Sequence, residues 1–246
     1  MTAERAVLIA AGFVLAGMVK GLIGLGLPTI AIGLLGLVMP PREAAVLLLL
    51  PSMVTNVGQL LAGPNVLPLV RRLWPLLIAG VVGTWLSVGT LAGSGRSSVQ
   101  AVLGAALIAY AVVGLTRYQP RVTPGMERWA GPAVGFLTGL VGGATSVFTV
   151  PGVPYLASLG FDRDALVQAL GLSFTVSTVA LAAGLAWYGA VPWQGAGASV
   201  LAVVPALTGM AAGGWLRGRI RPGVFRVCFF AGLLVLGTEL LLRGFA

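Results

Sequence analysis

Two glycine-rich stretches, each followed by a proline, interrupt the apolar sequence of this chain. The first reads Lys20-Gly21-Leu22-Ile23-Gly24-Leu25-Gly26-Leu27-Pro28, and the second reads Gly142-Gly143-Ala144-Thr145-Ser146-Val147-Phe148-Thr149-Val150-Pro151. Glycine destabilises a helix and readily adopts the backbone conformations that end one, and proline is favoured in the first turn of the next helix. Both stretches therefore predict a break inside a long apolar segment.

The segments that contain the two breaks run from about 5 to 41 and from about 129 to 161. As one straight helix the second would be about 50 Å long, whereas the hydrocarbon core of a bilayer is about 30 Å thick. We therefore expect each segment to be a re-entrant hairpin of two half-helices with its tip near the midplane. Such backbone is tolerated where it is buried in protein or lines a cavity.

The rest of the chain predicts single membrane-spanning helices. Hydrophobic residues make up 58% of the 246 residues and charged residues 9%, whereas a soluble domain carries about 25% charged residues. The fold class predicted is an all-α polytopic membrane protein with two inverted repeats. Its six spans are expected at about 43–63, 72–93, 98–117, 164–188, 195–216 and 222–243.

The composition argues against several other classes of protein. The formal net charge is +9, but the basic residues lie singly or in small groups between apolar stretches, which is typical of topology signals rather than of nucleic-acid binding. Histidine is absent, which removes most transition-metal sites and the histidine-dependent nucleophilic mechanisms. The single cysteine, Cys228, is interpreted as a small buried hydrophobe. We predict no catalytic residue, no metal and no cofactor, and we interpret the short N-terminus before Arg5 as the start of a retained segment.

The arginines discriminate between two topologies. If each broken segment crossed the membrane once, the arginines would divide equally between the two sides. If each is a hairpin, ten fall on one side and four on the other, which the positive-inside rule prefers. The loop 118–128 is then cytoplasmic, and both termini of this inner-membrane protein lie outside the cytoplasm. The ten are Arg71, Arg72, Arg117, Arg121, Arg128, Arg163, Arg217, Arg219, Arg221 and Arg226, and the four are Arg5, Arg42, Arg96 and Arg243.

The chain also repeats itself. Each repeat is predicted to hold one hairpin and three spans, at 1–117 and 129–246, joined by the cytoplasmic linker 118–128. Because three is odd, the two repeats have opposite orientations, which is a recurring plan of secondary transporters. The matches are Pro41-Arg42-Glu43-Ala44 with Asp162-Arg163-Asp164-Ala165, Ser52 with Ser173, Asn56 with Ser177, Gly63 with Gly184, Gly12-Phe13 with Gly135-Phe136, and Gly83-Thr84-Trp85-Leu86 with Gly213-Gly214-Trp215-Leu216.

At these residues the sequence resembles the sulfite exporter TauE/SafE family of membrane transporters over nearly its whole length. The resemblance rests on the repeated glycine-rich segment with its proline and on the acidic-Ala step that follows, Glu43-Ala44 in the first half. Lys20-Gly21 with Pro51, Asn56 and Gln59 resembles one branch of the family. The second half departs from the pattern, because Ala144-Thr145-Ser146 follows Gly142-Gly143. The family implies transport of small anions such as sulfite, sulfonates or related organic acids.

Lys20 is the one basic residue predicted to lie deep in the membrane, where an unpaired charge is costly. It is either a counter-ion for an anionic substrate or a lysine that reaches an interface or a helix end. The second limbs of the hairpins begin near Pro28 and Pro151, so their N-termini would aim free N–H groups at the centre. The alternative is a hairpin tip packed for structural reasons.

Ser52, Asn56 and Gln59 share one helix face. With the repeat mates Ser173 and Ser177, and Thr178 beside them, they are candidates to hydrogen-bond an anion, or else to bond helix to helix. No acidic residue suggests a proton relay or a carboxylate-rich sodium site, so the coupling ion is left open. The predicted substrate-binding set is Lys20, Gly21, Gly24, Gly26, Thr29, Ser52, Asn56, Gln59, Gly142, Gly143, Thr145, Ser146, Ser173 and Ser177.

The sequence thus predicts a secondary transporter, and more specifically an exporter, of a small anion. Its expected partners are that anion and the lipid bilayer, with no nucleic acid, and a homo-oligomer is compatible with the sequence. The alternative is an anion channel or passive pore of the same architecture. An intramembrane enzyme is disfavoured because histidine and a buried carboxylate pair are missing, and a structural subunit stays open.

Overall fold

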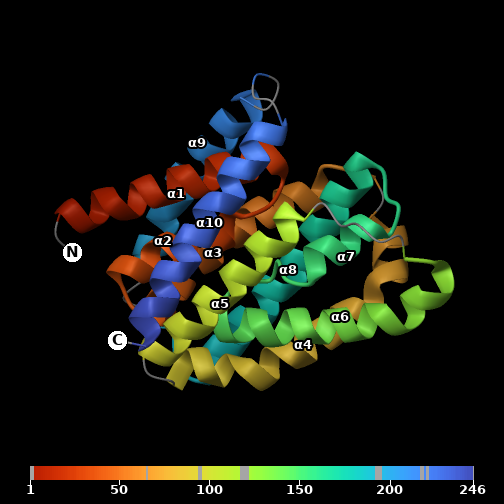
Figure 1. Cartoon of the computed structure of the whole chain (residues 1–246), viewed down its shortest axis with the longest axis horizontal. Coiled ribbons are helices and arrows are strands. Elements are labelled where there is room, and N and C mark those ends of the chain that lie inside the picture. The colour runs from red at the N-terminus through yellow and green to blue at the C-terminus, as the bar shows by residue number, and fades with distance from the viewer. Residues whose placement is uncertain are drawn as a thin grey trace.

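The described part of the chain is entirely helical (Figure 1). A computed structural model describes residues 3–64, 66–93, 96–116, 122–191, 196–216, 219 and 222–245, which form ten α-helices and no strand. The helices are α1 Ala3–Ile23, α2 Leu27–Val38, α3 Pro41–Leu61, α4 Val66–Gly93, α5 Arg96–Leu115, α6 Pro124–Thr145, α7 Gly152–Ser158, α8 Arg163–Trp187, α9 Ala196–Leu216 and α10 Pro222–Phe245.

The six expected single spans correspond to α3, α4, α5, α8, α9 and α10, and the two breaks fall between α1 and α2 and between α6 and α7. Residue 117, the linker residues 118–121 and residue 195 lie outside the described residues. Helix α4 begins at Val66, before the expected residue 72, because Arg71 and Arg72 continue the helix rather than precede it. Helix α6 begins at Pro124, where proline takes the first helical turn, before the expected residue 129.

The described helices bury an apolar core that also holds a group of polar side chains, and they expose many large apolar side chains on the outside, as a protein surrounded by lipid does. Seven of them are long and apolar enough to cross a membrane, by length and composition: α1, α3, α4, α5, α8, α9 and α10. Large apolar side chains such as Leu86 and Leu201 face outward, whereas Asn56 and Gln168 are buried. The chain is therefore a multi-pass membrane protein.

The two breaks are built differently. Between α1 and α2, Gly24 and Gly26 have φ angles of 82° and 100°, which favour glycine because a side chain there is strained. Between α6 and α7, Ser146 takes the left-handed conformation with a φ of 64°. The limbs before the breaks are longer than the expected half-helices, since α1 has 21 residues and α6 has 22, while α2 has 12 and α7 has 7.

Helices from the two halves of the sequence pack against each other through glycines. Helix α1 lies along α9, and α6 lies along α4 (Figure 1). A methyl group added at Gly21 of α1 would overlap the carbonyl oxygen of Met210 in α9, and one added at Gly139 of α6 would overlap that of Gly80 in α4. Backbones approach this closely in membranes where both surfaces are small.

The start of α6 lies against the end of α7. The N–H of Val122, just before α6, donates a hydrogen bond to the carbonyl of Ser158 at the end of α7 (3.2 Å). Arg72 of α4 joins the same corner, with 2.8 and 2.9 Å bonds to the carboxylate of Glu127 and one to the carbonyl of Leu159 (3.2 Å). The chain therefore enters α6 and leaves α7 at the same end of the molecule.

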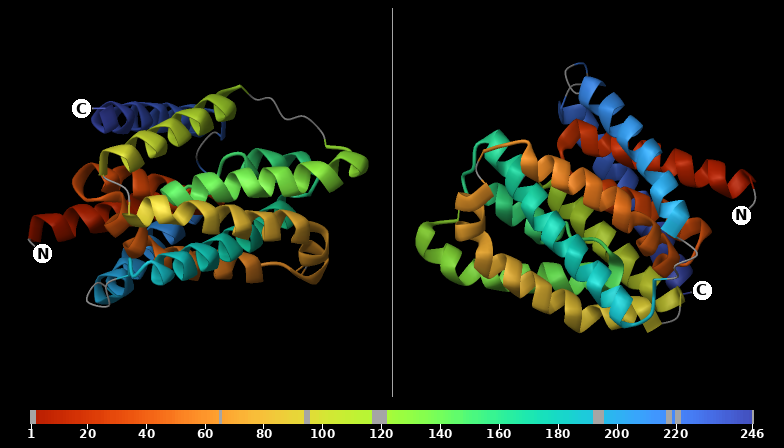
Figure 2. Two further views of the ribbon diagram at one scale, coloured as in Figure 1. Left: turned by 90° about the horizontal axis from the view of Figure 1, so that it is seen from below. Right: turned by 180° about the vertical axis from the view of Figure 1, so that it is seen from behind.

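At the opposite end, Arg42 donates to the backbone carbonyls of Ala92, Gly189 and Ala190 at 3.3 to 3.4 Å. It thereby joins the start of α3 to the ends of α4 and α8. The first turn of α1 and the last turn of α10 lie at the same end of the long axis but at different depths of the molecule, and α1 projects beyond its neighbours (Figure 1 and Figure 2).

Candidate anion site

Lys20 lies in the last turn of α1 and is buried, with 3% of its surface exposed. Its side-chain nitrogen donates hydrogen bonds to the hydroxyl of Thr55 (3.1 Å) and to the side-chain oxygen of Asn56, both on α3. Both acceptors are neutral. The structure therefore places Lys20 among buried polar groups of another helix.

A line of hydrogen bonds continues from Lys20 across the interior. The amide nitrogen of Asn56 donates to the hydroxyl of Thr178 on α8 (3.3 Å), and that hydroxyl donates to the carbonyl of Phe174 (2.7 Å). The hydroxyl of Thr55 donates to the carbonyl of Pro51 one turn earlier (2.8 Å). Because each hydroxyl proton is directed to a backbone carbonyl, the oxygens of Thr55 and Thr178 are left to accept.

Pro51 also shapes α3 locally. Proline has no N–H, so the carbonyl of Leu47 loses its helical partner. The hydroxyl of Ser199 on α9 donates to that carbonyl instead (3.0 Å). Helix α9, from the second half of the chain, thus supplies the hydrogen bond that Pro51 removes from α3.

Gln59 holds the first break in place. Its amide nitrogen donates to the carbonyl of Gly24 (2.7 Å) and to that of Val167 in α8 (2.9 Å). Gly24 therefore lies beside the last turn of α3, which ends at Leu61, rather than beside the middle of that helix as expected for a tip at the midplane. The long α1 accounts for this, because it carries the chain further before the break.

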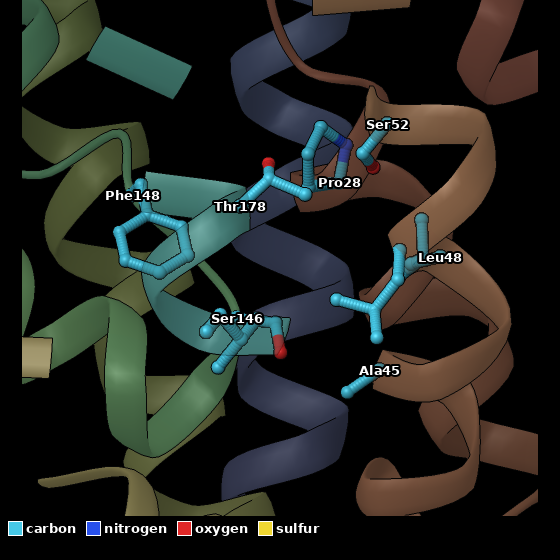
Figure 3. Close-up of a pocket in the computed structure, with 9 residues that line it drawn as sticks. Pro28, Ala45, Leu48, Ser52, Ser146, Phe148 and Thr178 are labelled. Atoms are coloured by element: carbon cyan, nitrogen blue, oxygen red, sulfur yellow. The ribbon is translucent and has the colours of Figure 1, made fainter. Parts of the chain in front are cut away.

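A small cavity of about 20 Å³ lies where the two breaks meet α3 and α8 (Figure 3). Pro28 at the start of α2 and Ser52 on α3 line it from the first half, and Ser146, Phe148 and Thr178 line it from the second half. The cavity holds about one water molecule. Ala45, Leu48, Leu49 and Leu181 complete the wall.

Two hydroxyls that line this cavity, those of Ser52 and Ser146, have no hydrogen-bond partner among the described residues. The buried hydroxyls of Thr29 in α2 and Thr149 in the second break are also without one there. A buried polar group usually has a partner, because leaving one unpaired costs about 1–3 kcal/mol. Four such hydroxyls therefore lie on α2, on α3 and in the second break.

Several of the predicted site residues have structural contacts instead. Gly21 packs on α9, Gly142 on the ring of Phe148, and Gly143 on Thr84 and Ser87 of α4. Gly26 caps the start of α2. The hydroxyl of Thr145 donates to the carbonyl of Val141 (2.6 Å) and accepts from the N–H of Val147 (3.2 Å), so it stabilises the end of α6.

Ser173 and Ser177 do not line the cavity, whereas Thr178 does. Ser173 is buried and Ser177 is partly exposed. The sequence reasoning also left out Thr55, which accepts from Lys20, and Phe148, which forms part of the cavity wall. Thr55 lies three residues after Ser52 and four before Gln59, so the helix face that carries those two residues also contains it.

The acidic residues for which the structure gives contacts are engaged elsewhere. Glu127 pairs with Arg72 and Glu239 with Arg243, while Asp162 caps the N-terminus of α8 by accepting from the N–H of Ala165. The described residues contain no group of three histidine, cysteine or acidic side chains that could hold a metal. The site is thus made of hydroxyls, one amide and one amine.

A multi-helix membrane protein with a buried cationic and hydroxyl-lined interior is the class that this fold and site define. The sequence matches the family model described as sulfite exporter TauE/SafE over residues 8–240, and the chain belongs to that family. No curated protein and no solved structure gives a significant match.

Proposed function

We propose that this chain is a secondary transporter of a small anion, such as sulfite, a sulfonate or a related organic acid, and that the anion binds between the two chain breaks. Membership of the TauE/SafE family supports export of a sulfite-like anion. The proposed position of the anion is supported by the cavity between Ser52 and Ser146. The hydroxyls of these two residues lack hydrogen-bond partners among the described residues. Lys20 supplies a positive group behind Asn56 and Thr178.

Inverted repeats are part of the proposal, and the register of the glycine contacts supports them. Gly21 faces the carbonyl of Met210 as Gly139 faces that of Gly80. The partner helices make the reciprocal contacts. Gly213 of α9 lies against the carbonyl of Met18 in α1, and Gly83 of α4 lies against the carbonyl of Phe136 in α6. Two helix pairs made of different residues therefore use one contact pattern. This register matches Met18 with Phe136, whereas the sequence comparison matched Phe13 with that residue.

Two re-entrant hairpins, one in each repeat, are proposed on the same basis. The bond between Val122 and Ser158 supports the second hairpin, because it joins the two ends of the α6–α7 segment. Helix α2 returns along α1, with Leu35 near Gly12, which supports the first. With this arrangement both termini lie outside the cytoplasm and the linker 118–128 inside it.

The size of the cavity favours a carrier over an open pore. An anion such as a sulfonate is larger than the one water that about 20 Å³ accommodates, so its binding requires the walls to part. Arg42 at one end of the bundle and Arg72 at the other join helix ends that such a movement would separate. A carrier alternates between access from the two sides by moving its halves around a central site.

The test is transport of sulfite into proteoliposomes that contain the purified protein. Saturable uptake that is accelerated by sulfite or methanesulfonate on the opposite side is expected of a carrier. Large single-channel currents in planar bilayers would establish the channel alternative, and absence of transport of both anions would overturn the proposal. Ser199→Ala is a suitable control, because Ser199 binds the Leu47 carbonyl and is not among the residues that line the cavity.

A further inference from the structure

The Lys20 nitrogen has two acceptors among the described residues, which is as many as the N–H groups of a neutral amine can serve. A neutral amine has two N–H groups and one lone pair, whereas an ammonium has three N–H groups and no acceptor. The side-chain nitrogen of Lys20 donates two hydrogen bonds, to Thr55 and to Asn56. Both donors of a neutral amine are thereby used, and the described residues give the nitrogen no third acceptor.

The helices packed around Lys20 bring no negative charge close to it among the described residues. Helices α2 and α9, which pack on α1, carry no charged residue. On α3 the charged residues are Arg42 and Glu43 in the first turn, and Glu43 lies about 18 Å along the helix from Thr55. On α8 they are Arg163 and Asp164, and Asp164 lies about 21 Å along the helix from Thr178. A buried ammonium without a counter-charge is strongly disfavoured.

We propose that the Lys20 amine takes up one proton when the anion binds and releases it when the anion leaves, so that the protein carries one proton with each singly charged anion. The inference rests on the proposed function. The anion supplies the counter-charge that the described residues around Lys20 do not provide, and the line from Lys20 through Asn56 to Thr178 connects the amine to the cavity wall.

The charge balance follows directly. In the empty carrier the Lys20 side chain is neutral, and in the loaded carrier its positive charge and the single negative charge of the anion cancel. The Lys20 side chain and the bound anion together therefore have no net charge in the loaded carrier, and the Lys20 side chain has none in the anion-free carrier. Transport would then depend on the gradients of the anion and of protons and not on the membrane potential.

The first experiment needs no substrate. The thermal stability of the purified, anion-free protein is measured from pH 6 to pH 9 beside Lys20→Met. If the folded chain holds a neutral amine that becomes protonated on unfolding, unfolding takes up a proton and wild-type stability rises with pH relative to the variant. The ratio of folded to unfolded protein should change by up to about tenfold per pH unit. A difference that stays constant with pH would overturn the proposal.

The second experiment uses methanesulfonate, which keeps its charge across this pH range. Uptake into proteoliposomes is measured with the membrane potential set by potassium and valinomycin. We expect uptake that increases with an acidic exterior and does not respond to the potential. Lys20→Arg has a guanidinium that cannot lose its proton, so its residual transport should respond to the potential. Wild-type uptake that follows the potential would overturn the coupling alone, whereas absence of any uptake would overturn the proposed function with it.

Discussion

The hydroxyls of Ser52 and Ser146 line the same cavity from the two halves of the chain, and both are without a hydrogen-bond partner among the described residues. One lies on a regular helix, α3, and the other on the break after α6. Their common environment means that a ligand between them would contact both repeats at once. Binding in such a position would depend on how the two halves are arranged.

Removal of either hydroxyl should weaken anion binding without unfolding the protein. A neutral hydrogen bond contributes about 0.5–1.5 kcal/mol, so Ser52→Ala should reduce the affinity for sulfite by roughly two- to tenfold. Its stability should be unchanged or higher, because the unpaired group is lost. Isothermal titration with a parallel melting curve measures both quantities. Unchanged affinity would exclude Ser52 from the binding site.

Ser146→Gly should separate binding from stability more sharply. Ser146 has a left-handed backbone, which costs roughly 1–2 kcal/mol for a residue with a side chain and little for glycine. The variant should therefore melt at a higher temperature than the parent while binding sulfite more weakly. A lower melting temperature would mean that the hydroxyl has a structural partner in the membrane.

Lys20→Met should fold and bind anions poorly. Methionine preserves the length of the apolar stem and removes the positive group, and a buried methionine is cheaper than a buried ammonium. A charge-assisted contact is worth about 1.5–3 kcal/mol, so the affinity for sulfite should decrease by tenfold or more. Lys20→Arg should restore little, since the planar guanidinium needs more space than the buried contact with Thr55 and Asn56 offers. Wild-type affinity in well-folded Lys20→Met would show that the site works without this amine.

Equivalent glycines should be equally intolerant of substitution. Gly21→Ala and Gly139→Ala each place a methyl group against a backbone carbonyl of the neighbouring helix, and overpacking of this kind costs about 1–3 kcal/mol. Gly58→Ala in α3 is the matched control, because nothing lies within 4 Å of its added methyl group. Melting temperatures in detergent make the comparison. A clear loss at one glycine and none at the other would argue against matching α1 with α6.

The topology is testable in intact cells. Tags at both termini should be accessible from outside without permeabilisation, and a cysteine placed in the linker 118–128 should react with an impermeant reagent after permeabilisation alone. The arginine distribution and the Val122–Ser158 contact motivate this expectation. A C-terminus that is protected in intact cells would contradict the two-hairpin arrangement.

The sequence predicted the all-helical membrane class, and helices lie where the six spans were expected, with a break at each glycine–proline stretch, because helix length and these residues are local signals. It placed the start of α4 too late, since arginines at a membrane surface do not end a helix. The packing of α1 on α9 has no local signal at all, because glycines on a helix do not specify which partner they face.

The site was predicted less completely than the fold. The predicted binding set contained Ser177, whereas its neighbour Thr178 accepts from Asn56 and lines the cavity. One residue on a helix turns the side chain by about 100°, so a shift of one position moves a residue off the polar face. Thr55 was missed for a related reason, because the polar face was drawn through Ser52, Asn56 and Gln59 alone.

The pairing of α1 with α9 has a consequence for the order of assembly. Roughly 190 residues separate the start of one from the start of the other, and synthesis at about 5–20 residues per second puts roughly 10–40 s between them. During that time the glycines of α1 that will contact α9 have no partner helix. The line of hydrogen bonds from Lys20 also lacks Thr178, which has not yet been synthesised. The first half of the chain is therefore an unfinished structure until the second half arrives.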